Sequence, residues 1–148
     1  MKLSCLLLAF VIFALPACQI PEEEGVVPEE RNYLGTVSVL RKGEHFDNDN
    51  IKVTYAPKGD EASITLHRIR FVPQMPVTID VTVPGVRISE SSDGAVLLSC
   101  DEAIPLALGG KYPRYKVTDF RGSIQSGQMS FSLNFGDYPT SFRGSLIQ

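Results

Sequence analysis

The chain of 148 residues predicts an all-β fold, a single eight-stranded antiparallel up-and-down β-barrel. Beyond Asn32, apolar and polar residues alternate with a period of two, which is typical of strands with one buried face. Turn signals such as Asp93-Gly94, Ser126-Gly127 and Gly136-Asp137 separate the alternating runs. Because closure removes the unpaired edges that promote aggregation, we expect this meander to close into a barrel.

The alternating runs predict eight strands, and no stretch beyond Asn32 has the pattern of an amphipathic helix. We expect strands over 33–40, 50–56, 62–71, 76–89, 94–100, 115–124, 128–135 and 140–147. The apolar residues that mark them, in chain order, are Val37 and Val39; Ile51, Val53 and Tyr55; Ile64 and Leu66; Val77, Ile79, Val81 and Val83; Val96, Leu97 and Leu98; Phe120 and Ile124; Met129, Phe131, Leu133 and Phe135; Phe142 and Leu146. The segments 47–50 and 56–59 are expected as turns.

Two of these strands are expected to bend. Strict alternation places Ile64 and Leu66 on one face of the strand and Ile69 and Phe71 on the opposite face. A bulge near His67-Arg68 would return Ile69 and Phe71 to the face of Ile64 and Leu66. Pro84-Gly85 predicts a second bend, because proline is not tolerated in a flat central strand.

A short repeat links the sixth and eighth strands. Phe120-Arg121-Gly122-Ser123-Ile124 is echoed by Phe142-Arg143-Gly144-Ser145-Leu146. The spacing equals one hairpin and its return, so the two copies are expected as parallel strands on either side of 128–135. The Phe, the Gly and the final aliphatic residue of each copy would share one face, with Phe120 and Phe142 inward, and Arg and Ser would share the other, with the glycines marking tight coiling.

The N-terminus has the pattern of a signal peptide over residues 1–17. Lys2 precedes an apolar run from Cys5 to Leu15, which is too short to span a membrane as a helix. The tetrad Leu15-Pro16-Ala17-Cys18 then resembles a bacterial lipobox. That resemblance implies removal of the signal and attachment of lipid to Cys18. An ordinary secretory signal, with a cysteine there by chance, is the alternative.

The rest of the chain divides into an acidic linker over 18–32 and a barrel domain over 33–148. The linker holds five glutamates with proline and glycine, which predicts a flexible spacer. From Tyr33 onward the acidic and basic residues balance, so the composition favours no nucleic-acid partner and no basic patch for anionic lipid. The expected location is the cell envelope, anchored to the outer membrane through Cys18, on its periplasmic or its surface face.

The lipobox, the acidic linker, the opening Tyr33-Leu34-Gly35-Thr36-Val37, the eight strands and the closing Phe142–Leu146 segment together resemble bacterial lipoproteins with a calycin-like, or lipocalin-like, β-barrel domain. The resemblance covers 33–148 and implies the fold. The chain departs from lipocalins proper because it contains no tryptophan for their Gly-x-Trp motif and has no C-terminal helix pattern.

The sequence offers no pattern for catalysis, a metal or a cofactor, and we expect a protein that is not an enzyme. The segment Glu44–Asp49, which contains His45, lacks calcium-loop spacing and is expected as a polar hairpin loop. His67 is expected as a half-buried or surface strand residue, and Cys100 as a small buried residue.

The segment 101–114 is the longest without an expected strand, and its residues Ile104 to Leu108 are mostly apolar. Because exposing such a run to water is unfavourable, we expect a flap packed across the end of the barrel. A lid or partner-binding loop at the barrel mouth is the functional alternative.

Two functions remain open from the sequence. Large inward residues favour a filled barrel that acts as a non-enzymatic interaction module, with an envelope protein as partner. A lumen that holds one small apolar or amphipathic ligand would instead make the chain a carrier. The residues expected to contact such a ligand, in the lumen or at its mouth, are Leu66, Val81, Phe131, Leu133, Leu106 and Tyr112.

Lipidation at Cys18 can be tested directly. We expect Cys18→Ala to leave the protein unprocessed or soluble, because the thiol that would receive the lipid is absent. Detergent-phase partitioning measures this, and partitioning unchanged in the variant would contradict lipidation.

Overall fold

A computed structural model describes residues 29–147, and Cys18, with the signal and most of the linker, lies outside this range. Within it, no helix is long and apolar enough to cross a membrane. The strands are β1 (Arg31–Arg41), β2 (Glu44–Lys58), β3 (Glu61–Ile69), β4 (Ile79–Glu90), β5 (Val96–Ala103), β6 (Leu106–Ala107), β7 (Gly110–Lys111), β8 (Val117–Gln125), β9 (Gln128–Phe135) and β10 (Tyr138–Leu146), with a 3₁₀ turn, η3 (Pro113–Tyr115).

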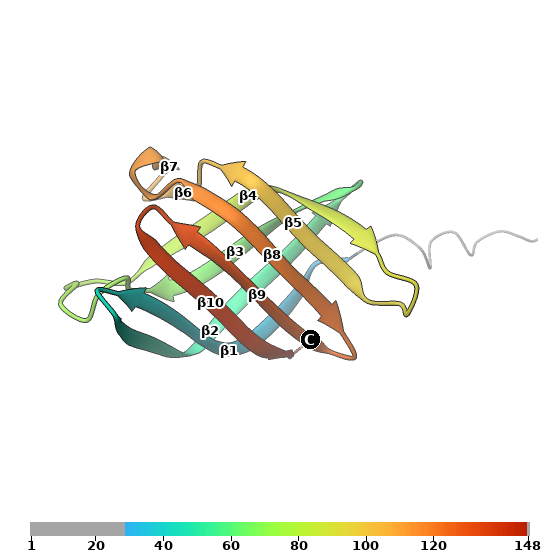
Figure 1. The fold of residues 1–148 in the computed structure, drawn as a ribbon, viewed down its shortest axis with the longest axis horizontal. Coiled ribbons are helices and arrows are strands. Elements are labelled where there is room, and N and C mark those ends of the chain that lie inside the picture. Colours follow the sequence, from blue (N-terminus) through green and yellow to red (C-terminus); the bar gives the residue numbers. More distant parts are fainter. Residues whose placement is uncertain (1–28, 148) are drawn as a thin grey trace, which may run out of the picture.

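The eight long strands form a closed antiparallel barrel, as the sequence predicts. Each long strand pairs with the next one along the chain, and β1 pairs with β10 to complete the ring. The short strand β6 pairs with β4, and β7 pairs with β6. Figure 1 shows β8, β9 and β10 crossing in front of β2 and β3. The predicted calycin-like, up-and-down fold is therefore confirmed.

Both predicted bends are confirmed as bulges. The register between β3 and β4 shifts between Leu66 and Ile69, where Arg68 has a φ of 62°. It shifts again opposite Pro84 and Gly85, where Gly85 has a φ of 70°. These extra residues bend the two strands and return Ile69 to the buried face.

The predicted turn at 47–50 is wrong, because this polar segment lies inside β2 and so is not a hairpin loop. The chain reverses earlier, at Lys42 and Gly43, whose φ values of 52° and 80° suit a two-residue hairpin turn. Pairing with β1 overrides the local turn preference of the Asp and Asn residues.

Asn48, within that segment, is a buried polar residue with a structural role. Its Nδ2 donates to the carbonyl oxygen of Arg70 over 3.0 Å, and its Oδ1 accepts from the Arg70 backbone N–H over 2.9 Å. The side chain thus supplies both hydrogen bonds that a neighbouring strand would give, and holds the chain where it leaves β3.

The predicted repeat builds the centre of the core. The copies lie on β8 and β10, on either side of β9. The ring of Phe131 on β9 stacks between Phe120 and Phe142, with centroid separations of 4.9 Å and 5.3 Å. A Cβ on Gly122 would collide with Phe131, and one on Gly144 would collide with the Phe142 ring. The glycines therefore provide the space that the three rings occupy.

The two ends of the barrel are distinct, because the connections of an up-and-down meander alternate between them. Figure 1 places β6 and β7 at the end away from the C-terminus. We name this the hairpin end, and it carries the connections 42–43, 70–78, 104–116 and 136–137. We name the other the tail end, and it carries the connections 59–60, 91–95 and 126–127, the start of β1 and the end of β10.

Aromatic residues close the hairpin end. Phe71 is buried, with ring centroids 4.5 Å from Tyr115, 5.2 Å from Phe135 and 5.9 Å from Tyr138. Tyr112 extends the cluster through Tyr115, at 5.1 Å. Burial raises the pKa of Tyr115, with a further rise from the neighbouring Tyr138 and Tyr112. The packing therefore favours the neutral form of the Tyr115 phenol, and the three tyrosines stay half-buried around the buried Phe71 ring.

The stacked rings and the outward arginines give a matched stability test. Phe120→Ala and Phe142→Ala should each lower the free energy of unfolding by about 3–5 kcal/mol, since each removes a buried ring. Arg143→Ala should lower it by less than about 0.5 kcal/mol as a surface change. Arg121→Ala removes an exposed ion pair with Asp101 and the hydrogen bonds that its Nη1 donates to the carbonyl oxygens of Phe120 and Cys100, and should lower it by about 1 kcal/mol. Denaturant titration measures both, and equal losses at Phe and Arg would contradict the assigned faces.

Candidate functional site

The six residues expected to contact a ligand do not come together in the structure. Leu66, Val81, Phe131 and Leu133 are core residues that expose at most 4 % of their surface. A side chain beside a water-filled lumen would keep accessible surface, so the interior around these four is filled. Tyr112 is half-buried in the aromatic cluster, and Leu106 lies on the exposed side of β6.

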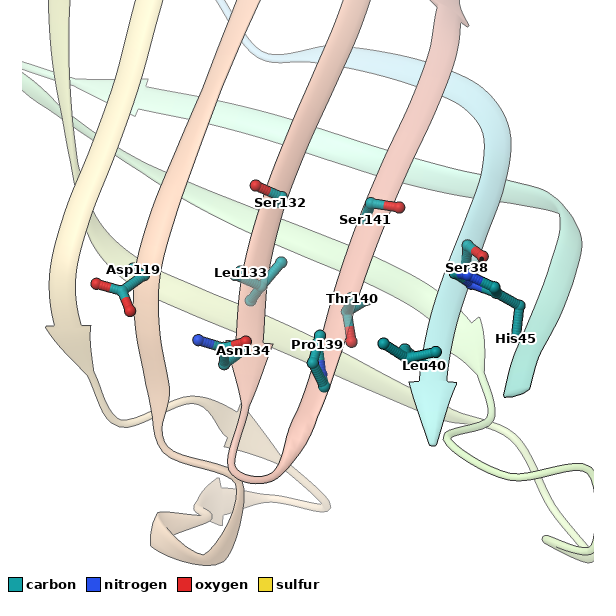
Figure 2. Close-up of a pocket in the computed structure, with 10 residues that line it drawn as sticks. All are labelled: Ser38, Leu40, His45, Asp119, Ser132, Leu133, Asn134, Pro139, Thr140 and Ser141. Atoms are coloured by element: carbon teal, nitrogen blue, oxygen red, sulfur yellow. Dashed lines mark hydrogen bonds between the residues drawn. The ribbon is translucent and has the colours of Figure 1, made fainter. Parts of the chain in front are cut away.

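The outer wall instead carries a polar groove across β9, β10 and β1. Ser132 pairs with Ser141, and Ser141 pairs with Ser38, so three small hydroxyl side chains form a row across the strands. We name the hollow along this row the serine groove. Figure 2 shows the row with Asn134, Pro139 and Leu40 beside it. The groove was not among the sequence predictions.

Two adjoining depressions make up the groove, and both include the three serines. The first has a volume of about 330 Å³ and reaches Leu40, His45, Asp119, Asn134 and Pro139. The second has a volume of about 510 Å³ and reaches Thr36, Asp47, Arg121, Ser130 and Arg143. Because the serines are shorter than these neighbours, the wall is hollowed along the row.

The row runs from a cation to an anion. At one end Ser132 pairs with Arg121, whose guanidinium lies 3.0 Å from Asp101. At the other end the Ser38 hydroxyl donates to Asp47 over 2.7 Å and lies 3.3 Å from Nδ1 of His45. The groove thus offers donors and acceptors at the wall of the barrel. Its chemistry suits hydrogen bonding to an extended polar segment of a partner.

The sequence carried a signal for this groove in the alternation itself. Ser130 and Ser132 alternate with Phe131 and Leu133 along β9, so small hydroxyl residues occupy its outer face. Which serines of other strands lie beside them depends on the pairing of β1 with β10, which no local pattern specifies.

A second polar cluster joins β2, β3 and β4 around His67. The Thr54 hydroxyl donates to Oδ1 of Asn32 over 2.7 Å and lies 2.8 Å from Nε2 of His67. Since that hydroxyl has one proton and gives it to Asn32, Nε2 must carry the hydrogen that it shares with Thr54. His67 is then a donor to Thr54, so this arrangement does not activate the hydroxyl. Asp80 lies 3.8 Å from Nδ1 and accepts from the backbone N–H of Arg68.

Metal-binding chemistry has no candidate in the described part of the chain. Among residues 29–147, no three His, Cys, Asp or Glu side chains gather where they could hold an ion. Cys100 is half-buried, and its thiol lies 3.4 Å from the carbonyl oxygen of Glu102.

Comparison with known proteins adds no assignment to these sites. Neither a protein-family model, nor a curated protein, nor a solved structure matches the chain.

The segment 101–114 differs from the expected loop. β5 extends to Ala103, and the chain then forms the β6–β7 hairpin, in which Ala107 pairs with Val81 of β4. Pro105 and Ala107 are buried, whereas Leu106 and Leu108 are exposed, because a strand presents alternate residues to opposite faces. The apolar run is therefore a half-exposed hairpin beside the barrel wall.

This alternation predicts different effects of one substitution at adjacent positions. Leu106→Asp should lower the free energy of unfolding by less than about 1 kcal/mol, because the carboxylate stays in water. Ala107→Asp should lower it by about 3 kcal/mol or more, because it places an unpaired charge in the core. Thermal and denaturant unfolding compare the two, and an equal loss at Leu106 would show that this side chain packs on the barrel.

Proposed function

We propose that the chain is a membrane-anchored lipoprotein whose barrel acts as a non-enzymatic interaction module of the cell envelope. The observation that carries this proposal is the filled interior, in which the inward residues of every long strand pack together. Because no open space surrounds the residues expected to hold a ligand, we expect a partner to bind the outer surface of the barrel.

The serine groove supports a protein as the partner. Its hydroxyl, amide, guanidinium and carboxylate groups lie within two adjoining depressions on one wall. An extended segment of an envelope protein can use all four kinds of group, since its backbone supplies both donors and acceptors. A carrier of apolar molecules would instead need a lining of hydrophobic side chains.

The tail end supports the proposed anchoring. β1 begins at Arg31 at this end, and the thirteen residues from Cys18 to Glu30 reach about 43–47 Å when extended. Lipid attached at Cys18 would keep the barrel within this reach of the outer membrane, with the groove along its side free to meet a partner.

Site-specific photocrosslinking in cells tests the groove as a partner surface. A photoreactive residue at Ser141 should crosslink to one discrete envelope protein, and Ser132→Trp in the same chain should abolish the crosslink by filling the groove. The matched control is a photoreactive residue at Ser89, which is exposed on β4 outside the groove and should give no product.

Native mass spectrometry tests the carrier function on the same purified protein. A small molecule that copurifies in stoichiometric amount, together with no crosslink from Ser141, would contradict the interaction module and favour the carrier.

A further inference from the structure

Three exposed aliphatic side chains lie at the hairpin end, and one of them, Val77, is outside the strand that the sequence predicts over 76–89, because β4 begins only at Ile79. Val77 in the 70–78 connection exposes 58 % of its surface, Leu106 on β6 exposes 40 %, and Leu108 at the hairpin tip exposes 69 %. The connection and the hairpin lie side by side, because Thr78 and Ile79 line one depression of about 630 Å³ with Leu106 and Leu108. The barrel therefore presents a group of aliphatic tips to solvent.

The backbone at the tip is unusual for the residue that it carries. Leu108 has a φ of 53° and Gly109 a φ of 86°, the conformation of a two-residue hairpin turn in which Asn or Gly is favoured at both positions. A bulky side chain adopts this conformation at an energetic cost. Leu108 is thus both strained and exposed, so neither turn geometry nor core packing accounts for a leucine there.

Charge is separated between the two ends, although the folded chain is nearly neutral. In the connections of the hairpin end the cations are Lys42, Arg70, Lys111, Arg114 and Lys116, and the anion is Asp137. Asp80, near the start of β4, lines the depression beside Leu106 and Leu108. In the connections of the tail end the anions are Asp60 and Asp93, with Glu29 and Glu30 just before β1, and these described segments contain no Lys or Arg. The sum of charge along the sequence is close to zero, and the alternation of connections between the two ends places these cations at the hairpin end.

We propose that the hairpin end docks on an anionic lipid surface. Leu108 and Val77 enter the headgroup region while Lys42, Lys111 and Arg114 contact lipid phosphates. Protruding aliphatic tips beside cations fit the interface of an anionic bilayer. A protein partner would be expected to use aromatic anchors, and the aromatic residues of this end are engaged in the cluster beneath.

This docking is compatible with a lipid anchor on the same membrane. The eleven residues of β1 span about 36 Å, which is the greatest distance that β1 can cover from its start at the tail end to the hairpin end. Residues 18–30 reach farther, about 43–47 Å, so the chain can pass from the tail end back to the surface on which the hairpin end rests. The inference stands apart from the serine groove, which lies on the wall.

Vesicle cosedimentation tests the proposal on the chain from residue 19, which lacks the acyl group and the signal. Residues 29–147 close on themselves as one barrel, so this chain keeps every described contact. We expect binding to vesicles of phosphatidylglycerol mixed with phosphatidylcholine, none to phosphatidylcholine alone, and weakening as salt rises.

Substitutions at the hairpin end should then weaken vesicle binding without unfolding the barrel. Leu108→Gly should lower binding about tenfold by removing the apolar tip, while the melting temperature stays equal or rises because glycine suits the positive φ. Lys111→Ala and Arg114→Ala should each lower it about fivefold.

The matched controls lie elsewhere on the barrel. Leu97→Ser removes an exposed leucine from β5, and Lys58→Ala removes a cation at the tail end, and both should bind vesicles like the parent. Ser132→Trp should also bind normally, which separates this test from that of the groove. Absence of binding to anionic vesicles at low salt, or binding unchanged in Leu108→Gly, would overturn the proposal. The exposed aliphatic side chains would then be assigned to contact with a protein.

Discussion

The stack of Phe120, Phe131 and Phe142 is the contact on which the rest of the barrel depends. The three rings lie across β8, β9 and β10 and take up the centre of the interior. They fit because Gly122 and Gly144 leave their inward positions empty of side chain. Glycine at these positions also lets the strands coil tightly, and strongly coiled strands close into a narrow barrel. Close packing and closure therefore have one cause.

Because the interior of the barrel is filled, binding is expected at its outer surface. That surface has two separate candidate regions, the serine groove and the hairpin end. The serine groove on the wall is polar, with hydroxyl groups between a guanidinium and a carboxylate. The hairpin end combines exposed Leu108 and Val77 with lysine and arginine side chains. The first region suits hydrogen bonding to a polar segment, and the second suits a surface that is both anionic and apolar. Because they lie on different parts of the barrel, both can be engaged together.

The errors of the sequence predictions also have physical causes. The segment 47–50 has the composition of a turn, yet it pairs with β1, because the hydrogen bonds of the sheet outweigh a local preference. Asn48 then has a buried role that no turn residue would have, since its amide completes the hydrogen bonding of the Arg70 backbone. The run Ile104 to Leu108 lacks the length of a strand, and its pairing with β4 emerges only when β4 lies beside it.

By itself the sequence determined the eight long strands in outline, the buried face of each, the bulges at Arg68 and Gly85, and the placing of the Phe-Arg-Gly repeat around β9. It was wrong at strand ends such as Val77 and Leu146, which are exposed because packing is incomplete at the rims of the barrel. These features follow from alternation and from residues such as proline and glycine, whose backbone preferences act over a few positions. The tertiary structure decided which distant residues meet. Ser38 lies beside Ser141 only because β1 pairs with β10, and Phe71 meets Tyr115 and Tyr138 only where three connections converge. The gathering of cations at the hairpin end has the same origin, because closure brings together connections that are far apart along the chain.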